Sequence, residues 1–193
     1  MSELRVDAIK NASGAGSLSL SGGNFNFDGN TLFVDATNNR VGVGTSTPSV
    51  PFEVTASGGI KLSSSPLMEN VNVVGNTVNS TTNINVLTAN VWMFTTAGTG
   101  NWAHNIRGNG STALNSILGI GQATVVTIIS ALGSNSGYGT TFQIDGVTQS
   151  VTWNGGTAPT AAGDTSGFDI YTYTIIKRAN ATFTVFGSTG RFG

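Results

Sequence analysis

Residue types that carry catalysis are sparse in this chain. His104 is the sole histidine and there is no cysteine, so a thiolate nucleophile and a Cys-ligated metal site are excluded. One imidazole without a cysteine or a carboxylate nearby in the sequence is a poor basis for a metal site or a catalytic triad. We therefore interpret His104, which follows Trp102 in an expected strand, as a structural or surface residue.

Glycoside hydrolysis needs a pair of carboxylates. The candidate donors Asp145, Asp164 and Asp169 lie near glycine-containing turns, where an aspartate usually bonds to the turn backbone. The glycine groups at 42–44 and 98–100 lack the lysine and the following helix of a phosphate-binding loop. The sequence therefore predicts no enzyme activity, no cofactor and no nucleotide site. A polysaccharide-cleaving spike is the enzymatic alternative, and it requires two of these carboxylates in one groove.

Aromatic side chains suggest binding rather than catalysis, because exposed rings stack on sugars and neighbouring amides form hydrogen bonds with them. Large aromatic residues of a small β-domain are usually buried, so a core or subunit-interface role is the favoured interpretation of most of them. For contact with a host glycan or surface protein we single out Trp153, Asn154 and Tyr138. Trp153 precedes an Asn-Gly-Gly loop, which is a suitable place for such a contact. The aromatic residues considered are Trp92, Trp102, Trp153, Tyr138, Tyr171 and Tyr173.

Composition limits the partners. The 193 residues are 38% hydrophobic and only 9% charged, with a formal net charge of -1, so the chain has no basic field for nucleic acid or an anionic membrane. Short apolar bursts between 27 glycines and many Ser, Thr and Asn residues predict an all-β fold. Charged residues near the N-terminus and the lack of a membrane-length apolar stretch predict synthesis in the cytoplasm without membrane insertion.

Residues 1–62 are expected to form an extended arm that contains a β-hairpin. A strand at 30–35, a turn at 36–39 and a return strand at 40–44 follow from the apolar residues and the Asn-Asn turn. Such a hairpin cannot bury enough surface alone, so we predict a homotrimer around a threefold axis. Gly42 and Gly44 are expected to let a neighbouring chain approach closely. The predicted trimer interface is Leu32, Val34, Val41 and Val43.

The segment 30–48 resembles a motif of bacteriophage tail fibres and tailspikes, and Pro51–Val54 resembles the strand that closes the same repeat. The resemblance implies a trimeric, β-rich virion element, although no intramolecular chaperone domain follows here. Residues 1–11 resemble the N-termini of structural proteins from marine and cyanobacterial phages, which attach a subunit to the virion. The predicted attachment residues, which would contact capsid, neck or tail proteins, are Leu4, Val6 and Ile9.

Residues 63–193 are expected to form a compact antiparallel β-sandwich. One short helix is expected at 111–118, capped by Ser111. This part resembles a domain of marine phage structural proteins through the loops at 102–110 and 153–159. The expected strands are 71–74, 82–87, 91–95, 103–107, 123–130, 140–144, 149–153, 168–177 and 181–186.

Together these features predict a non-enzymatic structural subunit of a tailed-phage virion. The expected assembly is a homotrimeric tail fibre, capsid fibre or decoration protein that is anchored by its N-terminal arm. The alternative is a receptor-binding module at the tip of a fibre, which recognises a glycan or a protein of the host surface.

Overall fold

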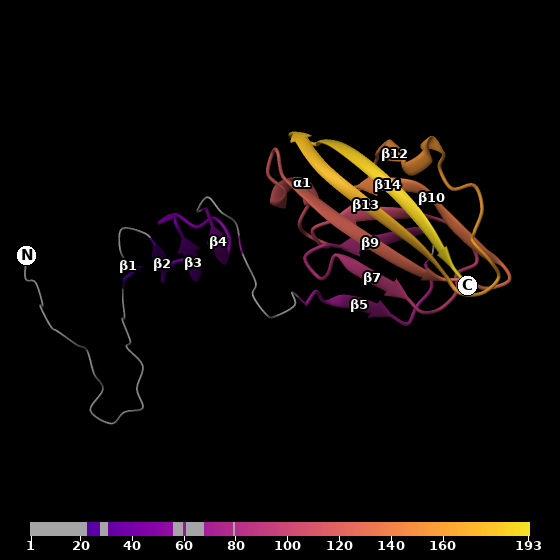
Figure 1. The fold of residues 1–193 in the computed structure, drawn as a ribbon, viewed down its shortest axis with the longest axis horizontal. Coiled ribbons are helices and arrows are strands. Elements are labelled where there is room, and N and C mark those ends of the chain that lie inside the picture. Colours follow the sequence, from indigo (N-terminus) through magenta and orange to yellow (C-terminus); the bar gives the residue numbers. More distant parts are fainter. Residues whose placement is uncertain (1–22, 28–30, 56–59, 61–67, 79) are drawn as a thin grey trace, which may run out of the picture. The chain divides into compact units, whose positions relative to one another are not determined.

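A computed structural model describes residues 23–27, 31–55, 60, 68–78 and 80–193 (Figure 1). The chain divides into two compact units, Met1–Leu67 and Met68–Gly193. Strands dominate both units, and the described residues contain one α-helix, α1 (Leu114–Ile117), which confirms the predicted all-β class. The predicted attachment residues Leu4, Val6 and Ile9 and the predicted boundary after residue 62 lie outside the described residues.

The N-terminal unit is a four-stranded sheet in the order β1-β2-β3-β4. Its strands are β1 (Phe25–Phe27), β2 (Leu32–Asp35), β3 (Arg40–Val43) and β4 (Phe52–Val54). Strands β2 and β3 form the predicted antiparallel hairpin, and β4 adds parallel to β3. The Asp35 carboxylate closes the turn by accepting from the backbone N–H groups of Thr37 and Asn38, both at 3.0 Å. A further bond from the Asn38 side chain, together with these, holds the pKa of Asp35 below its usual value.

The two glycines of β3 and its turn serve the chain itself. A Cβ on Gly42 would lie 2.3 Å from the carbonyl oxygen of Thr45, and Gly44 has a φ of +76°, which favours glycine. The turn after β3 therefore fills the space beside Gly42. The approach of a neighbouring chain at these glycines stays a prediction, because the Thr45 carbonyl already accounts for Gly42 and the positive φ for Gly44.

The C-terminal unit consists of two sheets that share one core, in the orders β12-β14-β13-β9-β7-β5 and β11-β10-β8-β6 (Figure 1). Both sheets mix parallel and antiparallel pairs, so the predicted antiparallel arrangement of the strands is wrong. The strands are β5 (Val71–Val74), β6 (Thr81–Asn85), β7 (Val91–Phe94), β8 (Gly100–Arg107), β9 (Ala123–Ala131), β10 (Ser136–Ile144), β11 (Val147–Thr148), β12 (Val151–Trp153), β13 (Phe168–Ala179) and β14 (Thr182–Phe192).

The order of the strands explains the parallel pairs. From β5 to β10, successive strands alternate between the two sheets. Each chain segment crosses to the opposite sheet and returns, so neighbours within a sheet run in the same direction: β5, β7 and β9 are parallel, as are β6, β8 and β10. Hairpins occur only where consecutive strands stay in one sheet, as β10–β11 and β13–β14 do.

The core is built around the inward side chains of β13. Tyr171, Tyr173 and Ile175 are each at most 1% exposed. The Tyr171 ring contacts His104 and the Tyr173 ring contacts Phe142, both of the opposite sheet. His104 is fully buried, and its Nδ1 lies 2.6 Å from the Tyr173 hydroxyl. Its ring also lies 3.9 Å from the Trp102 ring, centroid to centroid. His104 is therefore a buried structural residue, which is one of the two roles that the sequence predicts for it.

Helix α1 is capped from a distant loop. The expected cap Ser111 is wrong, because the helix begins at Leu114 and has no side-chain cap of its own. The Asp145 carboxylate instead accepts from the N–H groups of Leu114 at 2.7 Å and Asn115 at 3.0 Å. Asp145 reaches them from the tight β10–β11 turn, where it and Gly146 have positive φ angles of 52° and 81°.

Burial lowers the pKa of His104 to about 3, so a pH titration of stability tests its environment. Below about pH 6.5 the imidazole of the unfolded chain is protonated, whereas that of the folded chain stays neutral until about pH 3. The His104 contribution to the unfolding free energy is therefore fully present above about pH 6.5 and is lost as the pH falls towards 3. Between pH 7 and pH 4 we expect the His104 contribution to fall by about 3 kcal/mol, at about 1.4 kcal/mol per pH unit.

Urea unfolding followed by tryptophan fluorescence measures this effect, since all three tryptophans lie in the C-terminal unit. The control is His104→Gln, which removes the ionisable group at this position and keeps all the others, including Asp169. The difference in unfolding free energy between the two proteins should narrow on acidification. Parallel pH profiles would contradict a neutral, buried His104.

Candidate functional site

One side of the N-terminal sheet is apolar and only partly buried within the described residues, and we call it the N-terminal apolar face. Backbone register places Val34, Val41 and Phe52 side by side across three strands, and Val43 beside Val54. Leu32 and Val34 are each 37% exposed and Phe52 is 58% exposed. The face comprises Leu32, Val34, Val41, Val43, Phe52 and Val54, and thus brings together all four residues of the predicted trimer interface.

The opposite side of this sheet is covered by its own chain. Phe33 is buried there, Arg40 donates to the carbonyl of Pro48 at 2.7 Å, and the Glu53 carboxylate accepts from the Ser49 hydroxyl at 2.7 Å. The bonds from Ser49 also hold the pKa of Glu53 below its usual range. The loop between β3 and β4 thus bonds to the polar side chains on the Phe33 side of the sheet. The N-terminal apolar face lies on the opposite side. A contiguous, partly exposed apolar surface of this kind is typical of an interaction site.

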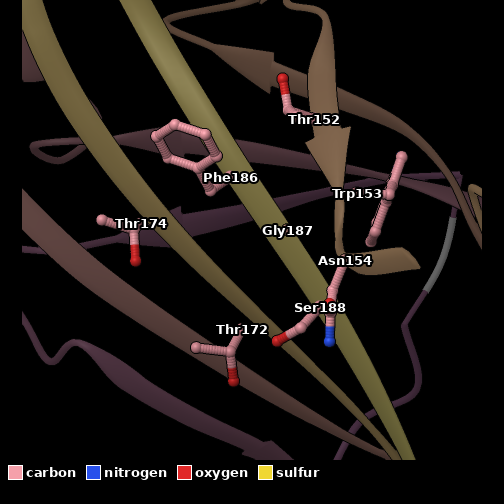
Figure 2. A pocket seen from close by; sticks show the side chains of 8 residues that line it. All are labelled: Thr152, Trp153, Asn154, Thr172, Thr174, Phe186, Gly187 and Ser188. Carbon is pink, nitrogen blue, oxygen red and sulfur yellow. The ribbon is translucent and has the colours of Figure 1, made fainter. Parts of the chain in front are cut away.

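A second candidate site is a hollow of 310 Å³ on the C-terminal unit (Figure 2). Strand register assembles it on the outer side of the six-stranded sheet, where Phe186 pairs with Thr174 on one side and with Thr152 on the other. Two residues further along β14, Ser188 pairs with Thr172. The lining residues are Thr152, Trp153, Asn154, Thr172, Thr174, Phe186, Gly187 and Ser188.

The predicted receptor residues divide between this hollow and other places. Trp153 and Asn154 line it, whereas Tyr138 belongs to β10 of the opposite sheet, is half-buried and donates its N–H to the Asn101 side chain at 3.2 Å. A second, smaller hollow of 190 Å³ between Gly139 and Pro159 also touches Trp153. Its walls include the buried residues Phe142 and Tyr173.

Trp153 packs as a structural residue. It pairs with Gly187, where a Cβ would lie 3.0 Å from the indole ring, and its ring meets that of Tyr173 edge-on at 5.8 Å. The aromatic ring exposed beside the hollow is that of Phe186, at 47% exposure, which sequence reasoning missed. Its signal is the alternation Thr184, Phe186, Ser188, which places an aromatic residue between hydroxyl residues on the outward side of a strand.

The three candidate carboxylates bond to backbone. Asp145 caps α1, and Asp164 accepts from the Thr165 N–H at 2.6 Å. Asp169 accepts from the Gly163 N–H at 3.0 Å, and burial raises its pKa. Within the residues described, no group of three or more His, Cys, Asp and Glu side chains gathers where it could hold a metal ion. No helix in the same ranges has the length and hydrophobicity to cross a membrane.

No protein family, no curated protein and no solved structure matches the chain.

The packing of Trp153 predicts that its loss weakens the fold. Trp153→Ala should lower the unfolding free energy by about 2 kcal/mol, below the range for a fully buried tryptophan because the residue is half-buried. Asn154→Ala, at the exposed next position, should stay within about 0.5 kcal/mol of the wild type. Urea denaturation followed by the fluorescence of Trp92 and Trp102 measures both. Equal stability of the two variants would show that Trp153 is not part of the core.

Proposed function

We propose that this protein is a non-enzymatic structural subunit of a phage virion that assembles as a homotrimer through the N-terminal apolar face. The observation that carries the proposal is the set of six apolar side chains on one side of a small sheet, with Phe52 58% exposed at its edge. Membership of a virion is supported by the resemblance of residues 30–48 to phage fibres. The subunit would form a fibre or a decoration of the tail or capsid.

The size of the N-terminal sheet supports assembly. Its strands are three or four residues long, and a sheet with an apolar face is stabilised by burying that face against another element. A second layer supplied by other copies would bury the exposed parts of Val34 (37%) and Phe52 (58%). Each would contribute a fraction of the roughly 1.5–3 kcal/mol that complete burial of such a side chain supplies. In a closed ring every copy buries the same surface, and three short sheets around one axis would form such a ring.

A single charge on the apolar face should disrupt the trimer. We expect the wild-type chain of 19.7 kDa to give a particle of about 59 kDa, three times that mass, by light scattering. Val34→Asp places three carboxylates at the centre of the assembly, where nothing offsets their desolvation, and should yield monomers.

The matched control for Val34→Asp is Thr37→Asp, in the exposed turn of the same hairpin. It adds the same charge and should leave the trimer intact. A wild-type chain that is folded and monomeric at micromolar concentration would contradict the proposal. So would a trimer that persists in Val34→Asp.

The virion part of the proposal predicts a separate role for the first residues. A chain without residues 2–20 should still form a trimer, because the N-terminal apolar face begins at Leu32. It should no longer be incorporated, because Leu4, Val6 and Ile9 are the proposed attachment residues. Mass spectrometry of purified particles made with each chain measures incorporation, and equal amounts of both chains would contradict the attachment role.

A further inference from the structure

We propose that the hollow on β12, β13 and β14 binds one sugar residue of a neutral glycan, with Phe186 as the stacking surface. The inference does not depend on the oligomeric state. It assigns a binding role to the outer side of the six-stranded sheet, which the proposed structural function leaves unused.

Phe186 has the position of a ligand-stacking ring. It is 47% exposed in the middle of a long strand and points to the outer side of the sheet. Its neighbours Val185 and Gly187 are buried because successive residues of a strand face opposite sides. Its partners in register are Thr174 and Thr152, so hydroxyl side chains flank the ring on both sides. A sugar presents C–H groups on one face and hydroxyls around its edge, which matches an exposed ring bordered by polar groups.

Five polar side chains around Phe186 are available for hydrogen bonds. Thr152, Thr172, Thr174, Ser188 and Asn154 all line the hollow. Figure 2 shows Thr152 and Thr174 on either side of Phe186, with Thr172, Ser188 and Asn154 further along β14. Within the described chain, their hydroxyl and amide groups have no side-chain hydrogen bond. Each hydroxyl can both donate and accept, and the Asn154 amide adds two donors and an acceptor. This combination suits the hydroxyl groups of a sugar, which also donate and accept.

The charge and the size of the hollow restrict the chemical class of the ligand further. None of the eight lining residues is charged, so a phosphate, a sialic acid or a uronic acid would find no cation to pair with and would lose its hydration. An apolar ligand would leave the polar side chains without partners. The volume of 310 Å³ is near the lower limit of about 300 Å³ for small-molecule sites, which suits a single sugar ring.

Saturation-transfer NMR on the full chain tests the site. The probes are glucose, galactose, mannose and N-acetylglucosamine, with N-acetylneuraminic acid and glucuronic acid as charged comparators. At least one neutral sugar should bind, and both acids should give no transfer. Phe186→Ala and Asn154→Ala should each weaken that binding by about five- to tenfold, on the scale of one aromatic contact or one hydrogen bond.

The matched control is Phe192→Ala, which removes the same ring from the end of the same strand, where Phe192 is 58% exposed. It should bind as the wild type does. The melting temperature and particle mass of Phe186→Ala should also equal those of the wild type. The proposal is overturned if no neutral sugar binds at millimolar concentration, if the acids bind equally well, if Phe186→Ala retains full binding, or if that substitution changes the particle mass.

Discussion

The structure depends on the alternation of side chains along β13, the strand that pairs antiparallel with both β9 and β14. Its inward positions carry Tyr171 and Tyr173, which close the core with His104 between them. Its outward positions carry Thr172 and Thr174, which line the hollow beside Phe186. One strand therefore supplies the aromatic interior and the polar surface of the candidate site, and a shift of one residue in register would exchange the two.

The same alternation has a different outcome in the N-terminal unit. There Val34, Val41 and Phe52 lie on one side, and Phe33, Gly42 and Glu53 on the other. The C-terminal unit covers its inner faces by packing one sheet on another. Within the described residues of the N-terminal unit, the chain covers only the side of Phe33. The self-association that we propose would cover the other side, and the proposed function as a β-rich structural subunit uses it.

Sequence reasoning found the strands where β-branched and aromatic residues are dense. The bounds of β5 match the expected ones, and those of β7 and β9 differ by one residue, while β14 continues past Phe186 to Phe192 because Gly187 and Gly190 are tolerated within it. Strand direction could not be predicted, since it depends on the alternation of strands between sheets. Other features depend on long-range contacts: the Asp145 cap spans about 30 residues, and the exposure of Phe186 requires knowing which side of β14 faces the core. That Val41 and Val43 lie on the same side of the hairpin could be predicted from their spacing alone.

Photo-crosslinking at Phe52 tests the central claim most directly. A benzoylphenylalanine at this position replaces one exposed aromatic residue with another and reacts with whatever lies against it. Irradiation should give covalent dimers and trimers on a denaturing gel, with the crosslinks mapped by mass spectrometry to residues 32–54 of another copy. The same photoreactive residue at Thr37, in the exposed turn, should give none. Monomers alone at Phe52, or crosslinks only within the same chain, would contradict assembly through the N-terminal apolar face.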